Sequence, residues 1–144
     1  MDNIFSKFIN NKINIQRLEK FAVIIGENPS KTARSPLLWN AAFRANKLNY
    51  SMVPLDVSKK NLVNVLNALK KNKDFIGGSV TVPYKIDIAK WLKDNLTIEA
   101  KNIGAVNCLY KNKDEVLKGT NTDGEASLIS FKKKFGEINN KNIY

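Results

Sequence analysis

The sequence has no histidine and only one cysteine, Cys108, among its 144 residues. With one cysteine it cannot form an intramolecular disulfide, and a zinc site built from cysteine and histidine ligands is not expected. The lack of histidine also excludes catalysis by a serine–histidine or cysteine–histidine pair. Any chemistry of this chain therefore depends on other side chains.

Arginine is also scarce, since Arg17, Arg34 and Arg44 are the only arginines among 24 basic residues in a chain of net charge +11. The charge by itself favours an anionic partner, such as nucleic acid, a membrane or a small acid. Arginine forks are the usual readers of DNA bases, and the lysines here are spread along the chain without a basic stripe on one helix. The sequence therefore predicts no nucleic-acid partner, and the charge reflects a bias toward lysine and asparagine.

Long apolar runs are absent as well. No stretch of the sequence approaches the roughly 18 apolar residues that a membrane-spanning helix needs. The N-terminus lacks the charged and apolar regions of a secretory signal. We therefore expect a soluble, cytoplasmic protein with no membrane partner. A length of 144 residues indicates one domain that buries a core of its own.

The sequence does contain an alternation of short apolar runs and helical patterns. Strands are predicted at residues 21–25, 50–55 and 75–82, and the helices between them begin near Ser35 and Ser58. Ser35 before a proline predicts the N-cap of the first helix. This order indicates βαβ units, so the predicted fold class is α/β: a three-layer α-β-α sandwich around a mainly parallel sheet of about six strands.

The C-terminal part of the chain has a different pattern. Residues 105–110 and 116–119 are predicted strands joined by a short turn, which favours an antiparallel hairpin near the C-terminus. A last helix is predicted to open at Asp123 or Gly124 and to end at Phe135. The domain prediction has three parts: residues 1–20 as an N-terminal extension (a short amphipathic helix or a loosely attached segment), 21–135 as the domain, and 136–144 as a tail.

One motif lies where folds of this class bind their ligands. Pro83 ends the third predicted strand because proline cannot donate to a sheet, and Lys85 follows just past the C-terminal end of that strand. In open α/β sheets this edge holds the ligand. Asn107 and Asp123 follow in later segments and would complete a site with an amide and a carboxylate.

In their order, these segments resemble the N-terminal, substrate-binding domain of shikimate dehydrogenase over about residues 21–135. The matching motifs are Asn28-Pro29, Arg34-Ser35-Pro36, Asn40-Ala41-Ala42-Phe43-Arg44-Ala45, Val80-Thr81-Val82-Pro83-Tyr84-Lys85, Ala100-Lys101-Asn102-Ile103-Gly104-Ala105-Val106-Asn107 and Asn121-Thr122-Asp123-Gly124. The resemblance implies an NADP-dependent oxidoreductase that reduces 3-dehydroshikimate to shikimate, on the pathway to chorismate and the aromatic amino acids.

The resemblance also implies the roles of the site residues. Lys85 would be the catalytic general acid and base, Asp123 its catalytic partner, and the substrate would be bound by Ser35, Thr81, Lys85, Asn107 and Asp123. The lysine chemistry has independent support, because reduction of a ketone needs a proton donor at the oxygen and a partly desolvated lysine can be that donor. Each residue also has a structural alternative: a surface lysine, a strand threonine, a turn asparagine, or a helix N-cap for Ser35 and Asp123.

Four positions depart from the family pattern. Thr32 and Ala33 replace a histidine–serine pair, Ser79 replaces an asparagine, and Trp39 replaces a histidine. Ala33 removes one hydrogen bond to the substrate carboxylate, which is worth about 1.5–3 kcal/mol. The redox groups are kept, so these departures leave two alternatives open: a site that admits a bulkier acid such as quinate, or a weakened copy of the shikimate site.

A glycine-rich G-x-G-x-x-G segment is also lacking. NADP is therefore expected as the cofactor of the parent enzyme, held by a missing or separate Rossmann domain that would start near residues 136–144, and no cofactor is expected on this chain alone. Three explanations stay open: an excised part of a longer enzyme, a truncated gene product, or one half of a split enzyme. The alternative function is a truncated, non-catalytic binding or assembly module for shikimate- or quinate-like acids.

Overall fold

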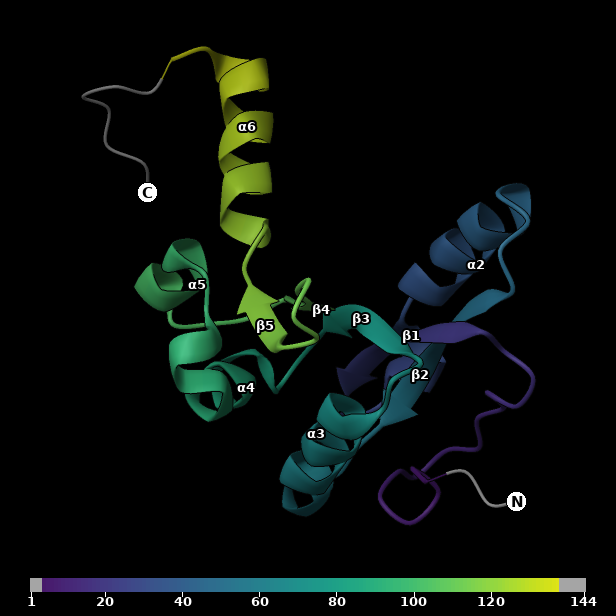
Figure 1. Cartoon of the computed structure of the whole chain (residues 1–144). Helices are drawn as coiled ribbons and strands as arrows, with labels where there is room; N and C mark the ends of the chain where they lie inside the picture. The colour runs from purple at the N-terminus through teal and green to yellow at the C-terminus, as the bar shows by residue number, and fades with distance from the viewer. Residues whose placement is uncertain (1–3, 138–144) are drawn as a thin grey trace.

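The computed structural model of the chain describes residues 4–137 and contains one five-stranded sheet in the order β2-β1-β3-β4-β5 (Figure 1). The strands are β1 (Lys20–Gly26), β2 (Tyr50–Asp56), β3 (Phe75–Val80), β4 (Cys108–Lys111) and β5 (Leu117–Thr120). β1 pairs in parallel with β2 and β3, whereas β4 is antiparallel to both β3 and β5. The predicted α/β class and the C-terminal hairpin are confirmed.

The described residues form five strands where about six were predicted. Leu96 makes one isolated parallel bridge with Gly119, so a further edge strand begins beside β5 but does not extend. It cannot extend because a 3-10 turn at Lys93–Asn95 precedes it and α5 (Ile98–Ile103) begins two residues after Leu96.

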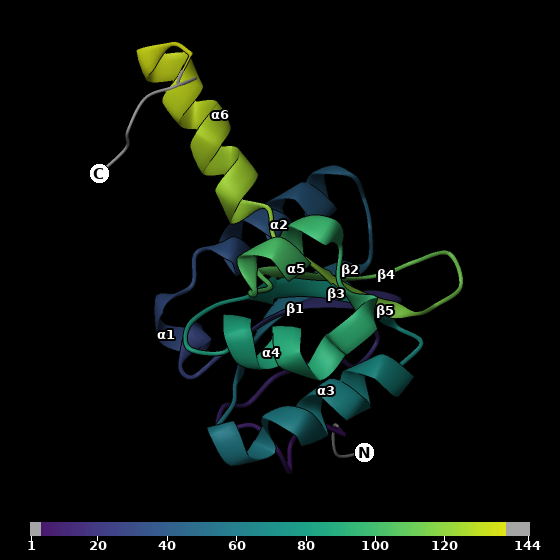
Figure 2. The same cartoon turned by 90° about the vertical axis from the view of Figure 1, so that its left-hand side faces the viewer.

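Helices lie on both faces of the sheet, as the three-layer prediction requires (Figures 1 and 2). Alternating residues of β1 explain this arrangement, because successive side chains of a strand point to opposite faces. Val23 and Ile25 belong to the larger core cluster, together with buried residues of α3 (Leu62–Lys71) and α4 (Lys85–Leu92). Ala22 and Ile24 form a smaller cluster with Phe43 of α2 (Ser35–Ala45). The remaining helices are α1 (Pro29–Thr32) and α6 (Asp123–Phe135). Within residues 4–137, no helix combines the length and the apolar character needed to cross a bilayer.

The segment before β1 is part of the core, although it forms neither a helix nor a strand between residues 4 and 19. Phe5 is fully buried in the larger cluster, with its ring edge-on to that of Phe21. Asn11 accepts a hydrogen bond from the backbone N–H of Asp56 and donates one to the carbonyl of Pro54, which ties the segment to the end of β2. The prediction of an amphipathic helix in this segment is thus wrong, because the apolar residues of the segment reach the core from turns. The domain limits at residues 21 and 135 stay predictions.

Helix α6 extends away from the rest of the molecule (Figure 1). None of its residues is buried, and Leu128, Ile129 and Phe135 expose large parts of their side chains. Acidic residues in its first turn and three lysines in its last turn complement the helix dipole. The predicted helix ending at Phe135 is confirmed, and most of the predicted tail, residues 138–144, lies outside the described part of the chain.

The turn from β3 into α4 positions the predicted catalytic lysine. β3 ends at Val80, two residues earlier than predicted, because the chain begins to turn at Thr81, whose carbonyl accepts a hydrogen bond from the N–H of Tyr84. Tyr84 is fully buried, and its hydroxyl donates a 2.6 Å hydrogen bond to the carbonyl of Val57. This anchored tyrosine, which has no predicted role, places Lys85 as the first residue of α4.

Candidate active site

Lys85, Asn107 and Asp123 converge at one end of the sheet, although they come from α4, from the residue before β4 and from the first turn of α6. The ammonium of Lys85 donates a 2.6 Å hydrogen bond to Oδ2 of Asp123. Asn107 Nδ2 donates a 2.7 Å hydrogen bond to the other carboxylate oxygen, Oδ1. The aspartate therefore has a donor on each of its two oxygens, and one of them is a cation.

Asn107 forms hydrogen bonds with several parts of this site through both its backbone and its side chain. Its backbone carbonyl accepts from the N–H of Val80 at 2.7 Å, and its own N–H donates to the carbonyl of Thr120 at 3.1 Å, so it joins β3 to β5. Its side-chain oxygen accepts from the N–H of Thr122 at 3.0 Å, and its Nδ2 also donates to the hydroxyl of Thr122 at 3.0 Å. Both amide protons thus have acceptors, which leaves a free lone pair on Oδ1 as the group that could accept from a substrate hydroxyl.

Asn121 fixes the start of α6 and has no predicted role. Its side chain is buried, its Nδ2 donates to the carbonyl of Ala105 at 3.1 Å, and its Oδ1 accepts from the N–H of Asp123 at 3.0 Å. Asparagine side chains often accept a hydrogen bond from the backbone N–H two residues ahead in a turn. The position of Asn121 just before a predicted helix could therefore have indicated this structural role.

The predicted N-cap role of Asp123 is wrong. The residue at the cap position is Thr122, and Asp123 is already the first helical residue. Its carboxylate turns to Lys85 and Asn107 because these two donors face it across the sheet end.

Both members of the ion pair remain accessible to solvent, with 36% of the Lys85 side chain and 54% of the Asp123 side chain exposed. The hydrogen bond from Lys85 has the largest effect on the pKa of the Asp123 carboxyl and lowers it. Burial opposes this effect, whereas the hydrogen bond from Asn107 and the charge of the ammonium lower the pKa further. The carboxyl is therefore ionised at neutral pH and holds the ammonium in place.

We expect Asp123 to titrate below its ordinary pKa of 3.8, and Lys85→Met to move its pKa back toward that value. Because folding lowers this pKa, the pair stabilises the fold at pH values above the ordinary pKa, and that contribution is lost as the pH falls through the lowered one. Carboxyl ¹³C shifts measured against pH test this expectation, with Lys60→Met, a change of an exposed lysine, as control. An unchanged Asp123 pKa in Lys85→Met would contradict it.

Ser35 and Thr81 are not joined to this cluster by any hydrogen bond within residues 4–137. Thr81 lines a hollow of about 280 Å³ at the end of β3, together with Thr32 and the segments Glu27–Pro29 and Val82–Pro83. Ser35 is half-buried at the start of α2. Its predicted N-cap role is wrong, since Arg34 occupies the cap position in a helical conformation and α2 has no side-chain cap.

Two of the four departures from the family pattern, Trp39 and Ser79, line the same hollow. Trp39, about half exposed, packs against Phe43 with ring centroids 5.9 Å apart. Trp39 and Ser79 both line an apolar hollow of about 230 Å³ between α2 and the strands β3 and β4, which Cys108 also lines. Burial raises the pKa of the Cys108 thiol, which keeps it protonated at neutral pH.

A family model described as "Shikimate dehydrogenase substrate binding domain" matches residues 24–109. The chain belongs to the shikimate dehydrogenase family. The resemblance drawn from the motifs is thus confirmed. Lys85 and Asn107 lie within the matched residues, whereas Asp123 follows them.

The similarity to individual shikimate dehydrogenases extends over most of this chain. It is 40% identical to the shikimate dehydrogenase (NADP(+)) of Methanococcus vannielii over 116 residues, which are 81% of this chain and 40% of that protein. The crystal structure of shikimate dehydrogenase from Aquifex aeolicus matches with a TM-score of 0.73 and 32% identity, over 88% of this chain and 46% of that one. The crystal structure of the enzyme from Listeria monocytogenes, in complex with shikimate and NAD, matches with a TM-score of 0.72 and 30% identity, over 89% of this chain and 44% of that one. The chain spans about 40% of the length of the curated relatives it matches.

Proposed function

We propose that this chain is the substrate-binding domain of an NADP-dependent shikimate dehydrogenase and that it supplies the proton-transfer group of that enzyme. The reaction is the reduction of 3-dehydroshikimate to shikimate, a step toward chorismate and the aromatic amino acids. The observation that carries the proposal is the 2.6 Å pair of Lys85 and Asp123, held by Asn107 where the parallel strands end. Ligands of open α/β sheets bind at this edge. A location in the cytoplasm stays a prediction.

The chemistry of the proposal lies in the proton. When a ketone is reduced to an alcohol, the carbonyl oxygen must gain a proton, and the Lys85 ammonium can give it without any histidine. In the reverse direction the neutral amine takes the proton from the substrate hydroxyl. Asp123 directs the ammonium, since its Oδ2 already accepts one of the three N–H groups and leaves two for the substrate.

The hydroxyl groups of the ring would be held by the same cluster. Each oxygen of Asp123 has more than one acceptor position and only one is used here, so both can still accept from a substrate hydroxyl. Asn107 offers its remaining oxygen lone pair. Thr81 and Ser35 would contact the part of the substrate that lies away from Lys85. Because Ala33 removes one hydrogen bond to the substrate carboxylate, binding measurements must decide between shikimate and quinate.

The described residues do not fit a dinucleotide. Among the described turns that lead from a parallel strand to a helix at this edge, only the one after β1 contains a glycine. This turn, Gly26-Glu27-Asn28-Pro29, has a single glycine and carries a carboxylate. The helix that follows it, α1, is only four residues long. A pyrophosphate cradle needs a glycine-rich turn and a longer helix N-terminus. We therefore propose that NADP, which is named for the relatives, is held by polypeptide outside residues 4–137.

Titration of the ¹⁵N-labelled chain with shikimate and then quinate tests whether this half of the site is preformed. We expect weak, saturable binding with millimolar affinity that moves the amide signals of Lys85, Asn107 and Asp123. Asp123→Asn should weaken it, while the exposed control Asp114→Asn should leave it unchanged. If the amide shifts do not follow a saturable curve even at ligand concentrations well above the expected millimolar dissociation constant, substrate binding by this chain is contradicted and a role in assembly is favoured.

A further inference from the structure

A group of lysines gathers at the end of the sheet opposite to the candidate active site. Lys20 is the first residue of β1, and Lys70 and Lys71 end α3 just before Lys73 and the start of β3. Lys111 joins them because β4 is antiparallel to β3, so that the last residue of β4 lies beside the first residues of β3. Together with Glu115 these five lysines line a hollow of about 400 Å³, here called the lysine hollow.

Two ammonium groups of the lysine hollow form hydrogen bonds with the backbone of the turn that follows α3. Lys20 donates to the backbone carbonyl of Lys73 at 2.8 Å, and Lys111 donates to that of Asn72 at 2.7 Å. The side chain of Lys111 is only 8% exposed. Two hydrogen bonds thus hold the turn that follows α3, and with it the backbone that carries Lys70, Lys71 and Lys73.

Positive charge in the lysine hollow exceeds the negative charge that faces it. Lys20 lies 3.7 Å from Asp74, and Lys111 lies 3.2 Å from Glu115. Lys70, Lys71 and Lys73 form no ion pair or side-chain hydrogen bond with any residue in the range 4–137. Their like charges repel one another, and an anion with several charges would relieve that repulsion.

We propose that the lysine hollow binds a small multivalent phosphate-type anion, such as pyrophosphate. Lysine ammonium groups bind phosphate oxygens as compact point charges, and three lysines without partners match an anion of two or more charges better than a monocarboxylate. No aromatic side chain and no arginine line the hollow, so it lacks the stacking surface and forks that single-stranded nucleic acid prefers. The site would be separate from the Lys85 cluster, because the two lie at opposite ends of the strands.

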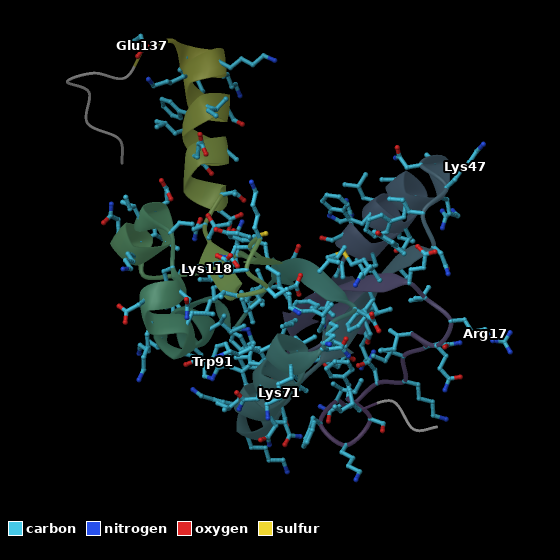
Figure 3. All side chains as sticks on the ribbon, in the orientation of Figure 1. Arg17, Lys47, Lys71, Trp91, Lys118 and Glu137 are labelled. Atoms are coloured by element: carbon cyan, nitrogen blue, oxygen red, sulfur yellow. The ribbon has the colours of Figure 1, made fainter. Side chains whose placement is uncertain are left out.

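Pyrophosphate titration at constant ionic strength, followed by ¹⁵N amide shifts, tests the proposal. The test variant is Lys70→Gln with Lys73→Gln, and the control is Lys47→Gln with Lys60→Gln, which removes the same charge elsewhere. Lys47 lies well apart from Lys71, beyond the end of α2 (Figure 3). All four lysines are exposed, so both variants should keep the fold, which their amide spectra verify.

In the native chain we expect shifts concentrated at residues 70–74 and 111. The test variant should bind pyrophosphate about tenfold more weakly, in the range that two exposed charge pairs provide, and the control should bind as the native chain does. Equal weakening in both variants, or the same shifts with sodium chloride alone, would overturn the proposal. Tighter binding of a single-stranded DNA trimer than of tripolyphosphate would also overturn it, since the ligand would then be a nucleic acid.

Discussion

Lys85→Ala should lower shikimate dehydrogenase turnover by about 10²–10⁴-fold, the range in which general acid–base catalysis contributes. The substrate oxygen would lose its proton donor, and Asp123 would lose the cation that it holds at 2.6 Å. The measurement requires an enzyme that also binds NADP. Residues 1–137 can be joined to the remaining part of the Methanococcus vannielii relative, which this chain matches over 40% of its length.

Two further variants separate proton transfer from charge pairing. Lys85→Arg keeps a cation beside Asp123 but removes a group that can release its proton, because the arginine pKa is above 12, so its turnover should fall nearly as far as that of Lys85→Ala. Lys60→Ala, a change of an exposed lysine elsewhere, should have no effect. Full turnover in Lys85→Ala would refute the catalytic role. A joined enzyme that binds shikimate but never turns it over would instead support the non-catalytic binding module.

Gly78→Ala should destabilise the fold by about 4 kcal/mol or more. Single substitutions have effects of this size only through a specific cause, such as overpacking of the core. An added Cβ at Gly78 would meet the backbone oxygen of Val23 at 1.9 Å. Because that oxygen belongs to the neighbouring central strand, β1 and β3 would have to separate. Urea unfolding followed by circular dichroism measures the change, and an expressed but unfolded chain is an equally clear positive result.

Gly104→Ala is the matched control for this prediction. Gly104 directly follows α5 with a φ of 73°, and within residues 4–137 no atom outside its chain neighbours would lie within 4 Å of an added Cβ. The substitution therefore tests backbone conformation alone and should reduce the free energy of unfolding by only about 1–2 kcal/mol. Equal losses at Gly78 and Gly104 would show that contact with β1 is not the cause.

The order of elements could be predicted because it depends on local patterns. The apolar run at β1 and the helical spacing of α3 are visible in the sequence, and both elements form where the patterns place them. The N-terminal segment shows the limit of this reasoning. Its scattered apolar residues have no clear period, and only the position of the core explains why Phe5 is fully buried.

The site could be predicted only in part. Lys85 and Asn107 lie where the motifs and the strand ends predict, but the orientation of Asp123 could not be derived from its place before a helix. The family resemblance implied that its carboxylate pairs with Lys85, and capping of the last helix was the structural alternative. The structure selects pairing, because residues 38 positions apart meet only when α4 and α6 begin at the same end of the sheet.

The sequence by itself determined the fold class, the family and the residue types of the site, because alternating patterns and ordered motifs are properties of the chain. It also determined what these 144 residues lack, above all histidine and a glycine-rich phosphate loop. Only the tertiary structure decided which charges meet. The lysines are spread along the sequence, yet the antiparallel register of β4 brings Lys111 to Lys20 and Lys73 at one end of the sheet. Charge interactions depend on distance in space, which strand pairing sets and sequence separation does not.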